Sequence, residues 1–158
     1  MNTWLFLDVD GVLNNESTKD LTPEGFRGLD EDKIVLLAGF VHEIGARVVL
    51  TSTWKDTDLW FREKNPGADL AYLLNRLAEH DVEIAAYARD GDRGAAVLAF
   101  LEKHPGKAII FDDGWKSSFK VAGVARFLVQ TSPREGLQDK HIRRAKRLLE
   151  WQEEKGDE

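Results

Sequence analysis

Residues 4–14 of the chain read Trp-Leu-Phe-Leu-Asp-Val-Asp-Gly-Val-Leu-Asn, an apolar run that ends in two aspartates and a glycine. The apolar run predicts a buried β-strand over residues 3–9. Asp10-Gly11 is a turn signal, so the strand ends there. A turn of the chain out of the strand would let the side chains of Asp8 and Asp10 face one pocket.

The rest of the chain alternates between helical and strand-like patterns. Apolar residues at helical spacing predict helices over residues 31–44, 69–80, 93–103 and 141–154, and a short helix over residues 56–63. Apolar runs predict further strands over residues 47–50, 82–86, 107–111 and 125–129. The polar residues 14–32 predict a loop or flap. This order predicts an α/β fold in which helices cover both faces of a parallel sheet.

Length and composition set the broad class of the protein. The chain has 158 residues, 42% hydrophobic and 32% charged, which fits a single soluble domain spanning residues 1–158. No apolar run approaches the roughly 18 residues of a membrane span, and no signal peptide is evident, so we expect no membrane partner and a cytoplasmic location. The absence of cysteine excludes disulfides, thiolate metal sites and cysteine nucleophiles. A net charge of -6 argues against tight non-specific nucleic-acid binding.

Polar residues follow three of the predicted strands directly. Asp8 and Asp10 follow the first, Thr51-Ser52 the second, and Asp112-Asp113 the fourth. Because the carboxyl ends of parallel strands meet at one edge of the sheet, the sequence predicts that four carboxylates and two hydroxyls converge there.

Each of these groups has a use in phosphoryl transfer. Asp8 can attack phosphorus as a nucleophile, while Asp10 protonates the leaving oxygen and then activates water. Gly11 lets the backbone turn sharply and approach a phosphate. The hydroxyl of Thr51 or of Ser52 can bind a phosphoryl oxygen.

Two kinds of cation would complete such a site. Clustered carboxylates favour a hard metal ion such as Mg2+, for which the candidate ligands are Asp8, Asp10, Asp112 and Asp113. A basic side chain would also steady the phosphate and the nucleophile. Arg93, at the start of the helix before the fourth strand, fits this role best, with Arg89 and Lys55 as alternatives.

These segments together resemble the haloacid dehalogenase (HAD) superfamily. The matching stretches are residues 6–14, residues 48–52, Arg93 and residues 109–113. The resemblance implies a Rossmann-like sheet of order 5-4-1-2-3 and a magnesium ion held by Asp8, the main-chain carbonyl of Asp10 and an acid of the 112–113 pair. It also implies a phosphatase rather than a dehalogenase, because dehalogenases do not need the second aspartate.

A closer likeness lies with the HAD domain of Swiss Army Knife RNA repair proteins. It rests on the first segment, on Thr51-Ser52-Thr53-Trp54-Lys55, on the aspartate pair, and on Pro133-Arg134-Glu135-Gly136-Leu137. That family often has Ser-Ser-x-Trp-Arg at the second segment and Gly-Leu-Thr near the end, so the departures here are mild.

The function predicted is a magnesium-dependent phosphomonoesterase that forms an aspartyl phosphate. Many relatives carry an inserted cap domain, but the loops here leave little room for one, and an open site suits a large substrate such as a phosphorylated nucleic-acid end. The alternatives are a small-metabolite or nucleotide phosphatase, a phosphotransferase, and a non-catalytic phosphate-binding module. The basic residues Arg143, Arg144, Lys146 and Arg147 are a candidate polynucleotide contact, although we favour a solvated helix face. The oligomeric state stays open.

Overall fold

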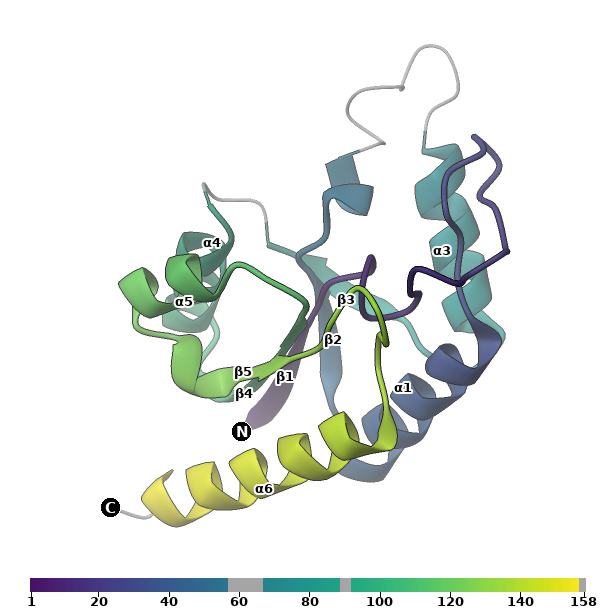
Figure 1. Ribbon diagram of the computed structural model, residues 1–158. Helices are drawn as coiled ribbons and strands as arrows, with labels where there is room; N and C mark the ends of the chain where they lie inside the picture. The colour runs from purple at the N-terminus through teal and green to yellow at the C-terminus, as the bar shows by residue number, and fades with distance from the viewer. Residues whose placement is uncertain (57–66, 89–91, 157–158) are drawn as a thin grey trace.

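A five-stranded parallel sheet forms the centre of the protein (Figure 1). The computed structural model describes residues 1–56, 67–88 and 92–156. The strands are β1 (Asn2–Leu7), β2 (Arg47–Leu50), β3 (Ile84–Tyr87), β4 (Gly106–Asp112) and β5 (Leu128–Gln130). Their order is β3-β2-β1-β4-β5, and every neighbouring pair is parallel. This is the order 5-4-1-2-3 counted from the other edge, so the predicted topology is confirmed.

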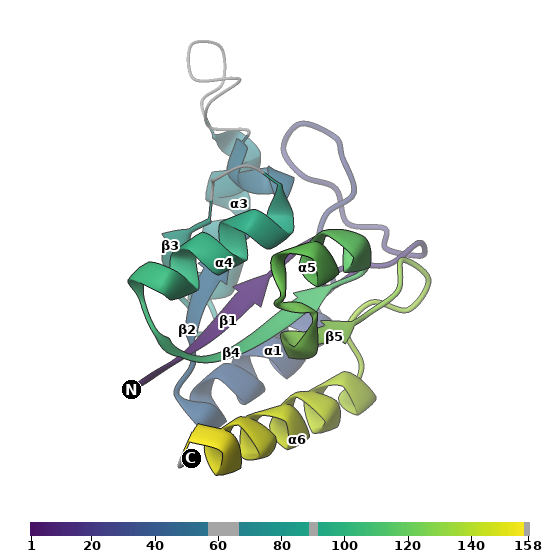
Figure 2. The same cartoon turned by 90° about the vertical axis from the view of Figure 1, so that its left-hand side faces the viewer.

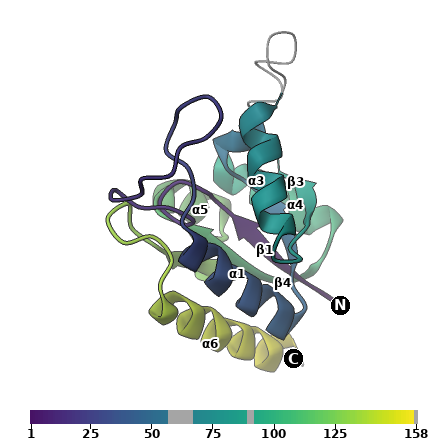
Figure 3. The ribbon, with the colours of Figure 1, turned by 90° about the vertical axis from the view of Figure 1, so that its right-hand side faces the viewer.

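Helices cover both faces of this sheet. They are α1 (Glu31–Ile44), α3 (Ala68–Ala78), α4 (Arg93–Lys103), α5 (Lys116–Ala122) and α6 (Asp139–Gly156), with short 3-10 turns η1 (Thr53–Asp56) and η2 (Ala125–Phe127). Figure 2 shows α4 and α5 on one face, and Figure 3 shows α1, α3 and α6 on the other. Within the described residues, no helix combines the length and the apolar character that crossing a bilayer requires.

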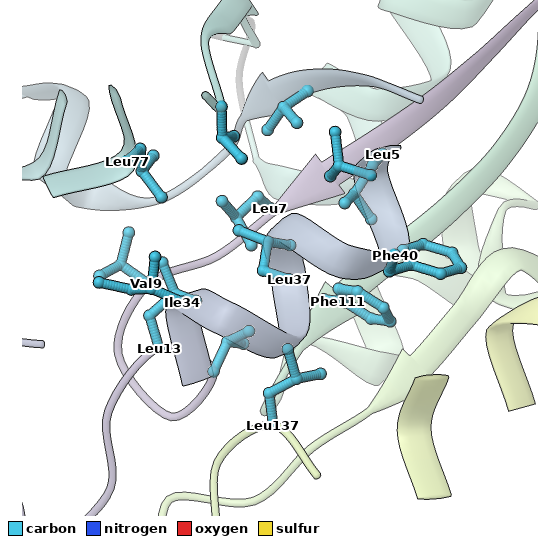
Figure 4. Close-up of a cluster of buried hydrophobic side chains, with 14 of the residues drawn as sticks. Leu5, Leu7, Val9, Leu13, Ile34, Leu37, Phe40, Leu77, Phe111 and Leu137 are labelled. Carbon is cyan, nitrogen blue, oxygen red and sulfur yellow. The ribbon is translucent and has the colours of Figure 1, made fainter. Parts of the chain in front are cut away.

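The alternating side chains of the strands divide the core into two halves. Leu5 and Leu7 of β1 point into the half beneath α1, α3 and α6, whereas Trp4 and Phe6 point into the half beneath α4 and α5. The other central strands alternate in the same way. Figure 4 shows the first half, in which Leu37 and Phe40 of α1 lie against Phe111 of β4. Burial on both faces explains why these strands read as continuous apolar runs.

The edge strand β5 is shorter than predicted. Residues 125–129 were expected to form one strand, but Ala125–Phe127 form η2 and only Leu128–Gln130 pair with β4. The side-chain amide of Gln152 instead bonds the backbone N–H and C=O of Ala108, at 2.9 and 2.8 Å. A residue of α6 therefore satisfies the part of β4 that a longer β5 would have paired.

Other differences are smaller. Helix α5 was not predicted, because it has only seven residues and one buried apolar side chain, Phe119, which is too short a pattern to show a helical period. The strand predicted over residues 82–86 begins later, at Ile84. The short helix predicted over residues 56–63 lies outside the described residues, apart from Asp56, which ends η1.

The two valines of α4 and α5 offer a matched test of this core. Val97 is 0% exposed and Val121 is 91% exposed. Val97→Ala should lower the free energy of unfolding by about 2 kcal/mol, because two buried methyl groups are lost and a small cavity remains. Val121→Ala should change it by less than about 0.5 kcal/mol. Urea denaturation measures both values, and similar losses for the two variants would contradict this packing.

Candidate active site

The residues predicted for the site lie together at the carboxyl edge of the sheet. Strand-like backbone bonds continue one residue past three strands and fix their ends relative to one another. The N–H of Asp8 donates to Phe111 O, that of Thr51 to Leu7 O and that of Thr131 to Asp112 O, each at 3.0 Å. The side chains that leave these positions therefore start from a rigid, common edge.

Three carboxylates form the centre of the site. Asp8 is 5% exposed, Asp112 is 0% exposed and Asp113 is half-buried. Each offers an oxygen, and these oxygens all lie within 4.8 Å of one another. Nη1 of Arg93 lies 3.1 Å from Asp8 Oδ1 and 2.8 Å from Asp112 Oδ2. One guanidinium thus faces three acids and cannot neutralise them alone.

The pKa values of these acids reflect that imbalance. Burial raises the pKa of Asp8 to about 8, and the neighbouring Asp112 adds to the rise, while Arg93 opposes it. Burial likewise raises the pKa of Asp112 and of Asp113. Burial and like charge both disfavour the ionised forms, so the protein alone does not readily hold three carboxylates here.

A hard divalent cation fits this set of donors. All three candidate ligands are carboxylate oxygens, which Mg2+ prefers, and neither histidine nor sulfur belongs to the cluster. The excess of negative charge and the oxygen donors therefore both favour a hard divalent cation at this cluster. Both acids of the 112–113 pair lie within the cluster, so each can supply a ligand oxygen.

Gly11 is needed where the loops of β1 and β4 meet. Its φ is +79°, and a Cβ on this residue would lie 2.1 Å from Oδ2 of Asp113. Any other residue would be strained in this conformation and would push Asp113 away. The hydroxyl of Thr131 donates to the carbonyl oxygen of Gly11 at 2.6 Å and holds the turn from the other side.

Asp10 has surroundings unlike those of Asp8. It is exposed, and two neutral donors hold it: Nδ2 of Asn14 donates to Oδ1 at 2.9 Å, and Nε1 of Trp54 donates to Oδ2 at 3.1 Å. Its side chain is thus fixed beside the carboxylate cluster without an ion pair among the described residues. Sequence reasoning did not predict these roles for Asn14 and Trp54.

Asn14 connects Asp10 to the rest of the fold. Its side chain is fully buried, accepts from the N–H of Gly11 at 2.9 Å and donates to the carbonyl of Gly28 at 2.8 Å. The bond to Gly11, three residues earlier, is a local Asx-type contact that the spacing could have suggested. The bond to Gly28 depends on how the flap folds back, which the spacing does not show.

The two candidate hydroxyls hold the turn after β2. Oγ1 of Thr51 donates to Leu7 O at 3.1 Å, and Oγ of Ser52 accepts from the N–H of Trp54 at 3.1 Å. Both residues lie buried at the edge of the site, and phosphate binding by either stays a prediction. Of the alternative cations, Arg89 lies outside the described residues, as does the side chain of Lys55.

The 133–137 segment packs against the loop that follows β1. The N–H of Leu137 donates to Val12 O at 2.8 Å, and its side chain is buried in the core. Gly136 has a φ of +68°, and a Cβ there would lie 2.6 Å from the carbonyl oxygen of Asn14. The close approach of the two backbones accounts for the glycine, and the burial of the next side chain accounts for the leucine.

The sheet order and the aspartates at the ends of β1 and β4 define a Rossmann-like α/β protein with an acidic site. The model of the family described as the HAD domain in Swiss Army Knife RNA repair proteins matches residues 4–142, and the chain belongs to this family. The match includes the four aspartates, Arg93 and the 133–137 segment, and it supports a HAD-type phosphatase role. A comparison with curated proteins found no match.

Replacing Asn14 tests how much its buried hydrogen bonds stabilise the loop that carries Asp10. Asn14→Ala should lower the free energy of unfolding by about 3 kcal/mol, because it leaves the buried N–H of Gly11 and carbonyl of Gly28 without partners. Asn15→Ala, next along the chain but half-buried, should cost less than about 1 kcal/mol. Chemical denaturation of both variants measures the difference, and equal losses would show that Asn14 has no special role.

Proposed function

We propose that this protein is a magnesium-dependent phosphomonoesterase that forms an aspartyl phosphate on Asp8. The observation that supports this best is the unlike setting of two aspartates only two residues apart. Asp8 is buried beside Arg93 and two other acids, whereas Asp10 is exposed and held by Asn14 and Trp54. These unlike settings support attack by Asp8 and proton transfer by Asp10, because environment separates the roles of paired carboxylates.

In the first step, a carboxylate oxygen of Asp8 attacks the phosphorus of a phosphate monoester. The bond from phosphorus to the leaving oxygen breaks as the new acyl-phosphate bond forms, and Asp10 gives its proton to the leaving oxygen. Asp10, now ionised, takes a proton from water in the second step. The resulting hydroxide attacks phosphorus, the bond to Asp8 breaks, and inorganic phosphate leaves with the Asp8 carboxylate restored.

The carboxylates of Asp8, Asp112 and Asp113 would hold the magnesium ion, together with the Asp10 main-chain carbonyl that the resemblance implies. When bound, the ion supplies the positive charge that lets an anionic nucleophile approach an anionic phosphate. Arg93 orients Asp8 through its ion pair. The indole of Trp115 lies 5.0 Å from the Arg93 guanidinium and helps to fix it.

A cavity of about 360 Å3 beside Asp10 suits the leaving group. Phe26, Arg27 and Trp54 are among its lining residues, and Phe26 is 64% exposed although it is large and apolar. Asp69 accepts from the N–H of Glu24 at 3.1 Å and anchors the flap that carries Phe26. Aromatic and cationic walls are typical of sites that stack a base, so we propose phosphorylated nucleic-acid ends as the substrate, in keeping with the description of the family.

Two substitutions separate the steps of the reaction. Asp8→Asn should lower kcat on an aryl phosphate by about four orders of magnitude or more, because the nucleophile is lost. Asp10→Asn should lower kcat by about 100- to 10,000-fold. A good leaving group needs little protonation, so Asp10→Asn should still form the phosphoenzyme and accumulate it. Acid precipitation with radiolabelled substrate detects the trapped protein.

Asp32→Asn is the control, because this exposed aspartate in the first turn of α1 lies outside the site. It should leave kcat unchanged. Turnover by Asp8→Asn close to that of the wild type would refute the covalent mechanism. A screen of 3′- and 5′-phosphorylated oligonucleotides against nucleotides and sugar phosphates would then test the substrate class, and a preference for sugar phosphates would contradict it.

Thermal unfolding tests the metal assignment without turnover. At about one hundred times its Kd, Mg2+ should raise the Tm of the wild type by roughly 5–10 °C. Asp113→Asn should abolish most of this rise, yet without metal the variant should be at least as stable as the wild type, because one of three clustered acids is gone. Asp32→Asn should keep the full rise. Undiminished phosphatase activity in excess chelator would overturn the assignment.

A further inference from the structure

A second cavity, of about 460 Å3, lies between the carboxyl end of β5 and the first half of α6. The chain leaves β5 there, loops past the site and returns as α6 (Figure 1). Gln130 and Thr131 form one wall, and Lys140, Arg144 and Arg147 of α6 form the other. The three basic residues share one face of the helix, because they are four and three residues apart.

Positive charge is in excess in this cavity. Its one carboxylate, Glu135, accepts from Nζ of Lys140 at 3.2 Å, so three cations less one anion leave two positive charges. Arg144 and Arg147 are exposed, and neither has an ion pair in the described part of the chain. The cavity is therefore positively charged, although the protein as a whole has a net charge of -6.

His141 adds a neutral donor to the same wall. Its Nδ1 accepts from the N–H of Gln138 at 2.9 Å, so the neutral ring carries its proton on Nε2. Burial lowers the pKa of His141, and the nearby Lys140 lowers it further. The ring is thus uncharged near neutral pH and can donate one hydrogen bond, which suits an anion more than a cation as the guest.

The cavity adjoins the carboxylate site. Thr131, in its wall, donates its hydroxyl to the carbonyl of Gly11 and its N–H to the carbonyl of Asp112. The cavity wall is therefore bonded directly to the two backbone segments, at Gly11 and Asp112, that border the carboxylate site.

We propose that this cavity binds a second phosphate of the substrate, namely a backbone phosphodiester next to the terminal monophosphate that Asp8 attacks. This inference rests on the proposed function and adds to it a second anion site. Guanidinium groups match phosphate oxygens through paired, charge-assisted hydrogen bonds. Phosphate contacts position a strand without reading its bases, so the site should accept any sequence.

The chain provides a matched control for this site. Arg143 is also an exposed arginine of α6, but it does not line the cavity. Arg144→Ala, Arg147→Ala and Arg143→Ala therefore remove the same charge from the same helix. Binding of fluorescent oligoribonucleotides with a 3′ or 5′ phosphate should be measured by anisotropy in excess chelator, so that no turnover occurs.

Arg144→Ala and Arg147→Ala should each weaken binding about tenfold, whereas Arg143→Ala should change it less than about twofold. The slope of log K against log salt should fall by about one for each cavity arginine removed. A nucleoside bisphosphate should show the same dependence on Arg144, and a mononucleotide with one phosphate should not. Turnover of a small aryl phosphate should be equal in all three variants.

The outcomes separate the two proposals. Equal losses of binding affinity in all three variants would mean that only the overall charge of α6 matters, and would overturn the cavity site. A mononucleotide that depends on Arg144 as strongly as the oligonucleotide would also overturn it. If Arg144→Ala weakens binding while the wild type hydrolyses no phosphate ester, the anion site stands and the proposed enzymatic function fails.

Discussion

Three clustered acids repel one another at the carboxyl edge of the sheet, and the surrounding fold holds them together against that repulsion. Asp8, Asp112 and Asp113 share one small volume with a single guanidinium, that of Arg93. Their convergence costs free energy unless a cation is present, and the fold holds them rigidly despite that cost. Parallel pairing of β1 with both β2 and β4 fixes the strand ends, and Gly11 lets the two acidic loops touch. A cluster held against repulsion in this way is typical of a functional site.

The sequence predicted most of the fold because its strongest signals were local. The boundaries of α1, β2 and α4 agree with the predicted ranges, since each element has a clear apolar period and a defined end, such as Gly45 after α1. The convergence of the acids was predictable too, because parallel strands place their carboxyl ends at one edge. Helix α5 and the split of residues 125–129 into η2 and β5 were not, because the first is too short and the second depends on Gln152.

The contacts that orient the site were harder to predict, because they join distant parts of the chain. Thr131 bonds the carbonyl of Gly11 across 120 residues, and Trp54 bonds Asp10 across 44. Hydroxyl and indole groups have many potential partners, and only the folded chain selects one. The basic residues of α6 show the same limit. No pattern in the sequence distinguishes Arg144 from Arg143, whereas in the fold Arg144 lines the cavity next to β5 and Arg143 does not.

The settings of Asp8 and Asp10 explain how one short segment can supply both a nucleophile and an acid. Full burial and acidic neighbours raise the pKa of Asp8, so its ionised form depends on positive charge supplied to the cluster. Asp10 is exposed, and the side-chain amide of Asn14 and the indole of Trp54 hold its carboxylate in place outside the buried cluster. A cation bound among the buried acids would therefore favour the ionised form of Asp8, while the carboxylate of Asp10 stays open to solvent. Gly11, directly after Asp10, has a positive φ that turns the chain out of β1 and leaves room for the side chain of Asp113 beside it.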